Sequence, residues 1–110
     1  MTYSSSIDSF QAIADPNRRH ILTLLSKGEK SINDISEHFD ISRPAISKHI
    51  KVLYHTGFIT IEEVGRERIC YLNQAGFDEI KTWMDFFEQY WNNQVQKLEN
   101  LLNKHKNQKK

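Results

Sequence analysis

The chain is poor in the features that mark secreted and membrane proteins. It has one cysteine in 110 residues, so it cannot close an internal disulfide, and a reducing compartment is expected. No apolar run approaches the roughly 20 residues that a membrane-spanning helix needs, and no signal-peptide pattern opens the chain. These absences argue against a disulfide scaffold and against a membrane protein, and they predict a location in the cytoplasm.

Motifs of catalysis are missing as well. The sequence has no glycine loop that would cradle a phosphate, no nucleophile motif and no H-E-x-x-H metal pattern. Net charge is also small, at +1, which taken alone argues only weakly for a nucleic-acid partner. An enzyme is therefore disfavoured, and no cofactor is expected.

What is present fits one small globular domain. A length of 110 residues, with 38% hydrophobic and 26% charged residues, is enough for one modest core. We predict a single domain over residues 1–104. The polar tail of residues 105–110 is expected to be disordered.

Residues 31–54 contain two short helical patterns separated by a tight break. Ser31, with Asp34 three positions later, is typical of a helix start. Ser42 is placed to cap a second helix, with Pro44 in its first turn. The residues of this second helix expected to face inward are Ala45, Ile46, Ile50, Leu53 and Tyr54. Two helices joined by a short turn, the second carrying cations and hydroxyls, predict a helix-turn-helix whose second helix lies in a DNA major groove.

The distribution of charge supports this prediction. No acidic residue occurs between Ser42 and Ile61, whereas Arg43, Lys48 and Lys51 lie in that stretch. Acidic residues gather instead in the C-terminal third. A local cationic patch beside an acidic remainder is the electrostatic pattern expected of a face that binds a duplex.

A β-hairpin is predicted directly after the second helix. Gly57 ends that helix, and residues 58–63 and 67–72 favour strands around a turn at residues 64–66. Such a hairpin is a wing, and Arg66 at its tip suits the narrow minor groove. The alternative for Arg66 is a solvent-exposed cation without a DNA role.

Each predicted DNA contact has a chemical reason and, for some, an alternative. Arg43 can pair bidentately with guanine, Ser47 and Lys48 can enter the groove, and Lys51 can contact phosphate. Ala45 either touches a thymine methyl or only packs, and His49 either contacts phosphate or is a core-edge histidine bonded to backbone. The full predicted set is Ser42, Arg43, Pro44, Ala45, Ser47, Lys48, His49, Lys51 and Arg66.

Two helices are predicted before the helix-turn-helix. The first covers residues 2–15, with Ser4–Ser6 as candidate caps. The second covers residues 16–27, with Asp15 as its cap, Pro16 in its first position and Gly28 after its end. Its first turn carries Arg18, Arg19 and His20, which either contact phosphate, pair with Asp15 or a partner chain, or form a solvated surface.

A single long helix closes the chain, from Asn73 to about Lys104. Apolar residues recur along it at three- and four-residue steps, namely Phe77, Ile80, Met84, Phe87, Trp91, Val95, Leu98 and Leu102. About 30 residues at a rise of 1.5 Å give roughly 45 Å, too long for so small a domain to cover. We therefore expect a two-fold homodimer through the first and last helices, which would set two recognition helices about 34 Å apart on a palindromic site.

Two further features leave alternatives open. The aromatic cluster Trp83, Phe86, Phe87, Tyr90 and Trp91 is either interface core or the lining of a pocket for a small-molecule effector of unknown identity. Cys70 is either a packed structural residue or an oxidant sensor. Free cysteines are usually buried, and Arg68 supplies little cationic activation, so the packed role is preferred.

The residues that carry these patterns resemble the ArsR family of winged-helix repressors. The resemblance rests on DPNRRHIL at residues 15–22, on DISEHFDISRPAISKHIKVL at residues 34–53 and on Gly57-Phe58-Ile59. It extends over roughly residues 10–72. It implies a dimeric transcriptional regulator, usually a repressor that leaves its operator when an inducer acts.

One departure from the family concerns metals. Metal-sensing members carry Cys-x-Cys-Asp at the start of the first helix of the helix-turn-helix, where this chain has Ser31-Ile32-Asn33-Asp34. Soft metals select sulfur ligands, and the long helix has no histidine before His105. Metal sensing is therefore not expected.

Together these observations predict a mainly α-helical winged helix-turn-helix, with four helices, a small β-hairpin and a last helix. The predicted function is a sequence-specific, dimeric repressor of double-stranded DNA that uses no metal. The alternatives are a metal- or redox-responsive repressor of the same fold and a winged-helix protein-interaction module.

Overall fold

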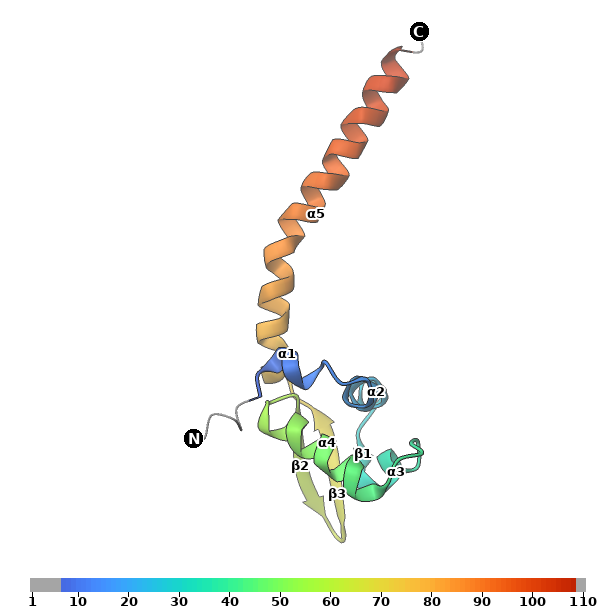
Figure 1. The fold of residues 1–110 in the computed structure, drawn as a ribbon, viewed down its shortest axis with the longest axis vertical. Helices are drawn as coiled ribbons and strands as arrows, with labels where there is room; N and C mark the ends of the chain where they lie inside the picture. The colour runs from blue at the N-terminus through green and yellow to red at the C-terminus, as the bar shows by residue number, and fades with distance from the viewer. Residues whose placement is uncertain (1–6, 109–110) are drawn as a thin grey trace. The chain divides into compact units, whose positions relative to one another are not determined.

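The computed structural model describes residues 7–108, and side chains over residues 7–105 (Figure 1). The elements in chain order are α1 (Ser9–Ala12), α2 (Pro16–Leu25), β1 (Lys30–Ser31), α3 (Ile32–Ser36), α4 (Arg43–His55), β2 (Ile59–Val64), β3 (Glu67–Leu72) and α5 (Gln74–Gln108). The chain divides into two compact units, one ending at Ile80 and the other beginning at Lys81. The first unit is a winged helix-turn-helix, as predicted.

Side-chain caps set where most of the helices begin. Asp15, Ser31 and Ser42 each accept a hydrogen bond from a backbone N–H in the first turn of the helix that follows, as the sequence predicts. The first helix differs from its prediction, because α1 covers only Ser9–Ala12 and its cap is Asp8. The candidate caps Ser4–Ser6 lie outside the described residues. Helix α1 begins after Asp8 because the reciprocal hydrogen bonds between Asp8 and Gln11 form a capping box.

The wing belongs to a three-stranded antiparallel sheet with the order β1-β3-β2. Strands β2 and β3 pair from Ile59↔Leu72 to Val64↔Glu67, which agrees with the predicted hairpin. Strand β1 was not predicted. It has two residues, Lys30 and Ser31, paired with Cys70 and Ile69, and two residues are too few to show a strand's alternating pattern.

The core lies where α2, α3 and α4 meet the sheet. Its buried apolar residues are Ala12, Ile21, Leu22, Leu25, Ile32, Ile35, Ile46, Ile50, Leu53, Phe58, Ile59 and Cys70. Tyr54 was expected to face inward but is 47% exposed, because it sits at the edge of the α4 stripe, beside the wing. Cys70 is fully buried, and burial raises the pKa of its thiol to about 11, with Arg68 lowering it only in part. The packed role predicted for Cys70 is confirmed.

Two glycines allow the start of α5 to pack against the end of α4. Gly57 follows α4 with φ +85°, a conformation that side chains disfavour. Its carbonyl accepts a hydrogen bond of 2.7 Å from the N–H of Gly76. A Cβ on Gly76 would lie 2.6 Å from the backbone nitrogen of Phe58, so only glycine fits. The ring of Phe77 then packs edge-on against that of Phe58, at 4.8 Å between centroids.

The second unit is the rest of α5, and its apolar side chains are largely exposed. The exposed fractions are 53% for Trp83, 60% for Met84, 61% for Trp91, 54% for Val95, 57% for Leu98 and 59% for Leu102. The helix continues to Gln108, past the boundary predicted for the tail, whose disorder stays a prediction. No described helix is long and apolar enough to cross a membrane.

Candidate nucleic-acid interface

Helix α4 presents a row of polar and cationic side chains on the surface of the first unit. Ser42 caps the helix, and its Oγ accepts from the N–H of Ala45 at 3.3 Å. The side chains of the row that are exposed are Ser42, Arg43, Pro44, Ser47, Lys48 and Lys51, whereas Ala45 is half-buried. The opposite face of α4 buries Ile46, Ile50 and Leu53. This burial fixes the rotation of the helix and therefore which residues face outward.

His49 lies at the border of this row and is bonded to side chains of α2 and its cap. Its Nδ1 lies 3.2 Å from Nη1 of Arg18 and 4.0 Å from Oδ1 of Asp15. The side chain of His49 is 18% exposed. Because a guanidinium can only donate, the Arg18 contact requires an unprotonated Nδ1, which leaves the proton of a neutral ring on Nε2. The phosphate contact predicted for His49 would therefore use Nε2.

Arg18 joins three helices through its guanidinium. Its Nε donates to the carbonyl of Ala12 at 2.6 Å and its Nη2 to the carbonyl of Gln11 at 3.2 Å, in addition to the contact with His49. These carbonyls belong to α1, and His49 belongs to α4. The ion pair with Asp15 that the sequence allowed is not found among the described residues, because only the backbone N–H of Arg18 bonds to the Asp15 carboxylate, at 3.1 Å. Arg18 thus holds α4 in position on α2.

Asp15 organises the same cluster from the start of α2. Partial burial raises the pKa of its carboxyl, but the N–H groups of Arg18 and Asn17, together with the nearby His49 and Arg18 side chains, outweigh this and hold the pKa below its usual 3.8. The folded protein therefore binds the proton less readily than the unfolded chain does. The stability that the ionised carboxylate contributes is present above pH 3.8 and is lost as pH falls through the lower folded value.

We expect Asp15→Ala to lower the free energy of unfolding by about 1 kcal/mol at pH 7, the usual cost of losing an N-cap. The difference from the wild type should shrink as pH falls below 3.8, because the wild-type carboxylate is then protonated. Urea unfolding at pH 7 and pH 3 measures both values. Asp40→Ala, at an exposed position, is the control. A difference that stays constant with pH would contradict the ionised cap.

The wing carries the second part of the candidate interface. Gly65 has φ +64° and turns the chain between β2 and β3, and Arg66 beside it is exposed, as predicted. On the hairpin, the Tyr71 hydroxyl donates to Oε1 of Glu62 at 2.7 Å. This bond spans the two strands and stiffens the hairpin.

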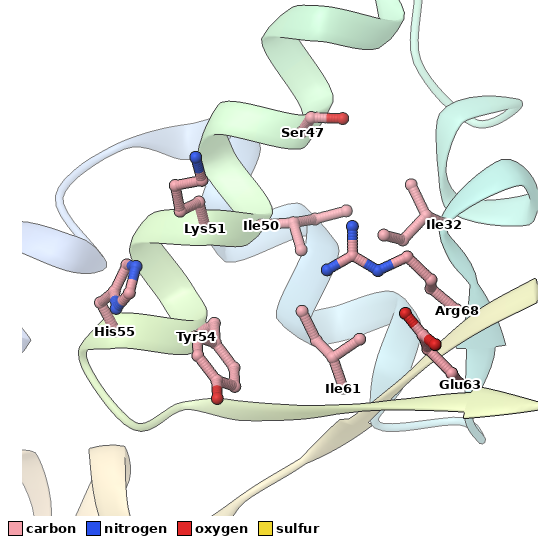
Figure 2. A pocket seen from close by; sticks show the side chains of 9 residues that line it. All are labelled: Ile32, Ser47, Ile50, Lys51, Tyr54, His55, Ile61, Glu63 and Arg68. Atoms are coloured by element: carbon pink, nitrogen blue, oxygen red, sulfur yellow. The ribbon is translucent and has the colours of Figure 1, made fainter.

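A groove runs between α4 and the wing (Figure 2). It is open to solvent, has a volume of about 470 Å³, and is lined by Ile32, Ser47, Ile50, Lys51, Tyr54, His55, Ile61, Glu63 and Arg68. A smaller hollow continues it past Ser47 and Arg68 to Arg43 and Arg66. The groove therefore connects the recognition helix to the wing tip.

Comparison with known proteins agrees with this geometry. Residues 15–60 match the model described as bacterial regulatory protein, arsR family. The chain is 40% identical over 75 residues to the transcriptional repressor SdpR of Bacillus subtilis (strain 168), an alignment that covers 68% of this chain and 83% of that protein. The chain belongs to the ArsR family.

A second relative and a solved structure show the same likeness. An arsenical resistance operon repressor of Staphylococcus xylosus is 34% identical over 85 residues, which cover 77% of this chain and 82% of the repressor. The crystal structure of the ArsR family transcriptional regulator RHA00566 superposes with a TM-score of 0.69 at 33% identity, over 76% of this chain and 92% of that one. This ArsR-family chain is therefore a DNA-binding transcriptional regulator.

The start of α3 in this ArsR-family protein is built for capping. Ser31 is buried, and its Oγ accepts from the N–H of Asp34 at 3.0 Å. Within the described part of the chain, no three His, Cys, Asp or Glu side chains are grouped to hold a metal ion. Ser31 thus has a structural role as the buried cap of α3.

Sequence reasoning missed one feature of the interface. Arg68 was considered only as a neighbour of Cys70, yet its side chain lies in the groove beside α4 (Figure 2). The sequence holds one indication of this role. Arg66 and Arg68 flank Glu67, the first residue of β3, and residues two apart along a strand face the same side. Without the packing of α4 against β2, however, nothing in the sequence places Arg68 beside the recognition helix.

Proposed function

We propose that this protein is a homodimeric repressor that binds a palindromic operator without a metal cofactor. Helix α4 enters the major groove, and Arg66 reaches the adjacent minor groove. The observation that carries the proposal is the exposed row on α4, where Arg43, Lys48 and Lys51 project from a helix whose other face is buried. The relative SdpR is itself named a transcriptional repressor. Such a regulator would act in the cytoplasm, where bacterial DNA lies.

The exposed face of α5 supports the dimer. Trp91, Leu98 and Leu102 are each more than half exposed, and isolated monomers rarely expose a continuous apolar face of this length. A second copy of the same helix, together with α1, would cover it in a two-fold arrangement. The same face carries Trp83, Phe87, Tyr90 and Trp91 of the aromatic cluster, which we assign to the dimer interface in preference to an effector pocket. Phe86 lies about 120° around the helix from Leu98, outside this face.

The predicted contacts divide into base-reading and phosphate-binding groups. Arg43, Ser47 and Lys48, with Pro44 and Ala45, lie in the first part of α4, which meets base edges when a recognition helix docks. Ser42, His49 and Lys51 flank this group and suit phosphate oxygens. Arg66 suits the minor groove.

We expect Lys48→Ala to weaken operator binding and to reduce its salt dependence. The plot of log affinity against log salt should flatten by up to about 0.9 for each copy of Lys48, because an ammonium held in the major groove displaces counterions condensed on the neighbouring phosphates. Fluorescence anisotropy of a labelled duplex across a salt series measures the slope. Lys27→Ala removes an equal charge from an exposed position outside the groove and serves as the control. An unchanged slope would remove Lys48 from the interface.

Selection of bound duplexes from a random pool tests the proposal as a whole. The expected result is a palindrome whose half-sites lie about one helical turn apart, roughly 10 base pairs, or a small multiple of it. Affinity for the selected duplex should be unchanged by zinc or cadmium. No enrichment over bulk DNA, or release by either metal, would contradict the proposal.

A further inference from the structure

Arg68 differs from Arg18 and Arg19, the two arginines of α2, in the partners of its guanidinium. Arg18 and Arg19 donate to backbone carbonyls of α1 and of the residues that follow it. Arg68, in contrast, has no hydrogen bond or ion pair with any residue in the described part of the chain. Its guanidinium therefore keeps five N–H donors for an external acceptor.

The surroundings of Arg68 favour an anion with a planar pair of oxygens. Figure 2 shows its guanidinium extending from β3 into the groove, toward Ile32 and Ile50. Lys51 and Ser47 line the same groove from α4. Guanidinium groups are weakly hydrated and tolerate apolar surroundings, and their fork of donors matches the oxygens of a phosphate. A hydroxyl and an ammonium on the opposite wall add two further phosphate donors.

The position of the groove indicates that this phosphate belongs to the DNA backbone between the major groove and the adjacent minor groove. In duplex DNA a sugar–phosphate strand separates the major groove from the neighbouring minor groove. If α4 lies in the major groove and Arg66 in the minor groove, the strand between those grooves must cross the space between α4 and the wing. That space is the groove lined by Ser47, Lys51 and Arg68.

We infer that the groove between α4 and the wing seats the DNA backbone, and that Arg68 binds a backbone phosphate there together with Lys51 and Ser47. This inference rests on the proposed function. It adds Arg68 of β3 to the interface, in addition to Arg66 at the wing tip. Arg68 would strengthen binding to any duplex, because a phosphate carries no sequence information.

Glu63 allows a second test of phosphate binding in the groove, because its charge is opposite to that of Arg68. It faces Arg68 across the β2–β3 pair and lines the groove, yet the two side chains make no ion pair among those within 4.0 Å in the described residues. A carboxylate beside a bound phosphate repels it. Neutralising Glu63 should therefore tighten DNA binding, whereas neutralising Arg68 should weaken it.

The experiment compares Arg68→Gln, Arg68→Lys, Glu63→Gln and the control Lys27→Gln in the full chain. Each is titrated with the selected operator and with a scrambled duplex over a salt series. Arg68→Gln should bind both duplexes about tenfold more weakly, as expected for a lost charge-assisted hydrogen bond, and its salt slope should fall by about 0.9 per copy. Arg68→Lys should keep the slope, Glu63→Gln should bind more tightly, and Lys27→Gln should match the wild type.

Two results would overturn the inference while leaving the proposed function intact. One is an Arg68→Gln slope equal to that of the wild type. The other is a loss confined to the operator, which would make Arg68 a base-reading residue. Failure of the wild type itself to prefer any duplex would instead contradict the proposed function. Circular dichroism establishes that the variants fold, as expected for substitutions at exposed positions.

Discussion

The variant Leu98→Glu is expected to be monomeric and to lose operator affinity by about 100-fold or more, the advantage that two linked half-sites confer. Leu98 is 57% exposed and lies on the same face of α5 as Trp91 and Leu102. In a dimer this face is buried, so a carboxylate at residue 98 would be taken out of water without a partner. The monomer can still contact one half-site, and weak non-specific binding should remain.

Sedimentation velocity and a gel-shift titration with the operator measure the two effects. The matched control is Asn93→Glu, which makes the same change in charge at an exposed position. Asn93 lies five residues from Leu98, about 140° around the helix, and therefore on the polar side of α5. Asn93→Glu should remain dimeric and bind normally. If Leu98→Glu also remained dimeric, the α5 face would not be the interface.

Gly76→Ala is expected to lower the free energy of unfolding by about 2–3 kcal/mol, the upper part of the usual cost of overpacking. The new methyl would lie 2.6 Å from both the Cγ and the backbone nitrogen of Phe58, and 2.7 Å from the carbonyl carbon of Gly57. Two of these three atoms are backbone and cannot move as a side-chain tip can. Alanine favours a helix over glycine by about 1 kcal/mol, so helix propensity alone would stabilise the variant. A net loss of stability would therefore be caused by the steric clash.

Urea unfolding at one fixed protein concentration measures this loss, since dimerisation makes stability depend on concentration. Gly65→Ala is the comparison, because Gly65 has φ +64° but no atom within 4 Å of an added Cβ. It should cost only about 1 kcal/mol, the penalty of a left-handed conformation for a residue with a side chain. A Gly76→Ala protein as stable as the wild type would mean that α5 does not begin against Gly57 and Phe58.

The starts of the central helices and the outward face of α4 could be predicted from the sequence because local chemistry decides them. Asp15, Ser31 and Ser42 are caps whose partners lie two or three residues away, and the spacing of Ile46, Ile50 and Leu53 fixes which side of α4 is buried. Once that side is buried, Arg43, Ser47, Lys48 and Lys51 must face outward. The candidate base-reading residues therefore follow from periodicity.

The contacts between distant segments could not be predicted in this way. The approach of His49 to Arg18 spans 31 residues, and strand β1 consists of two residues that become a strand only by pairing with β3. Tyr54 lies on the edge of an apolar stripe, and only the neighbouring wing decides its exposure. The first helix is shorter than predicted because Asp8 and Gln11 form a capping box at its start. Several polar residues of this stretch could have capped a helix, and the sequence does not show which one does.

The sequence by itself therefore determined the order of the elements, their caps, the buried face of α4 and the family, since each depends on residues within a few positions of one another. Only the tertiary structure decided the cluster of Asp15, Arg18 and His49, the closeness of Gly76 to Phe58 and the place of Arg68 beside the recognition helix. These features depend on how the helices and the sheet pack, and packing joins residues whose separation along the chain carries no periodic signal.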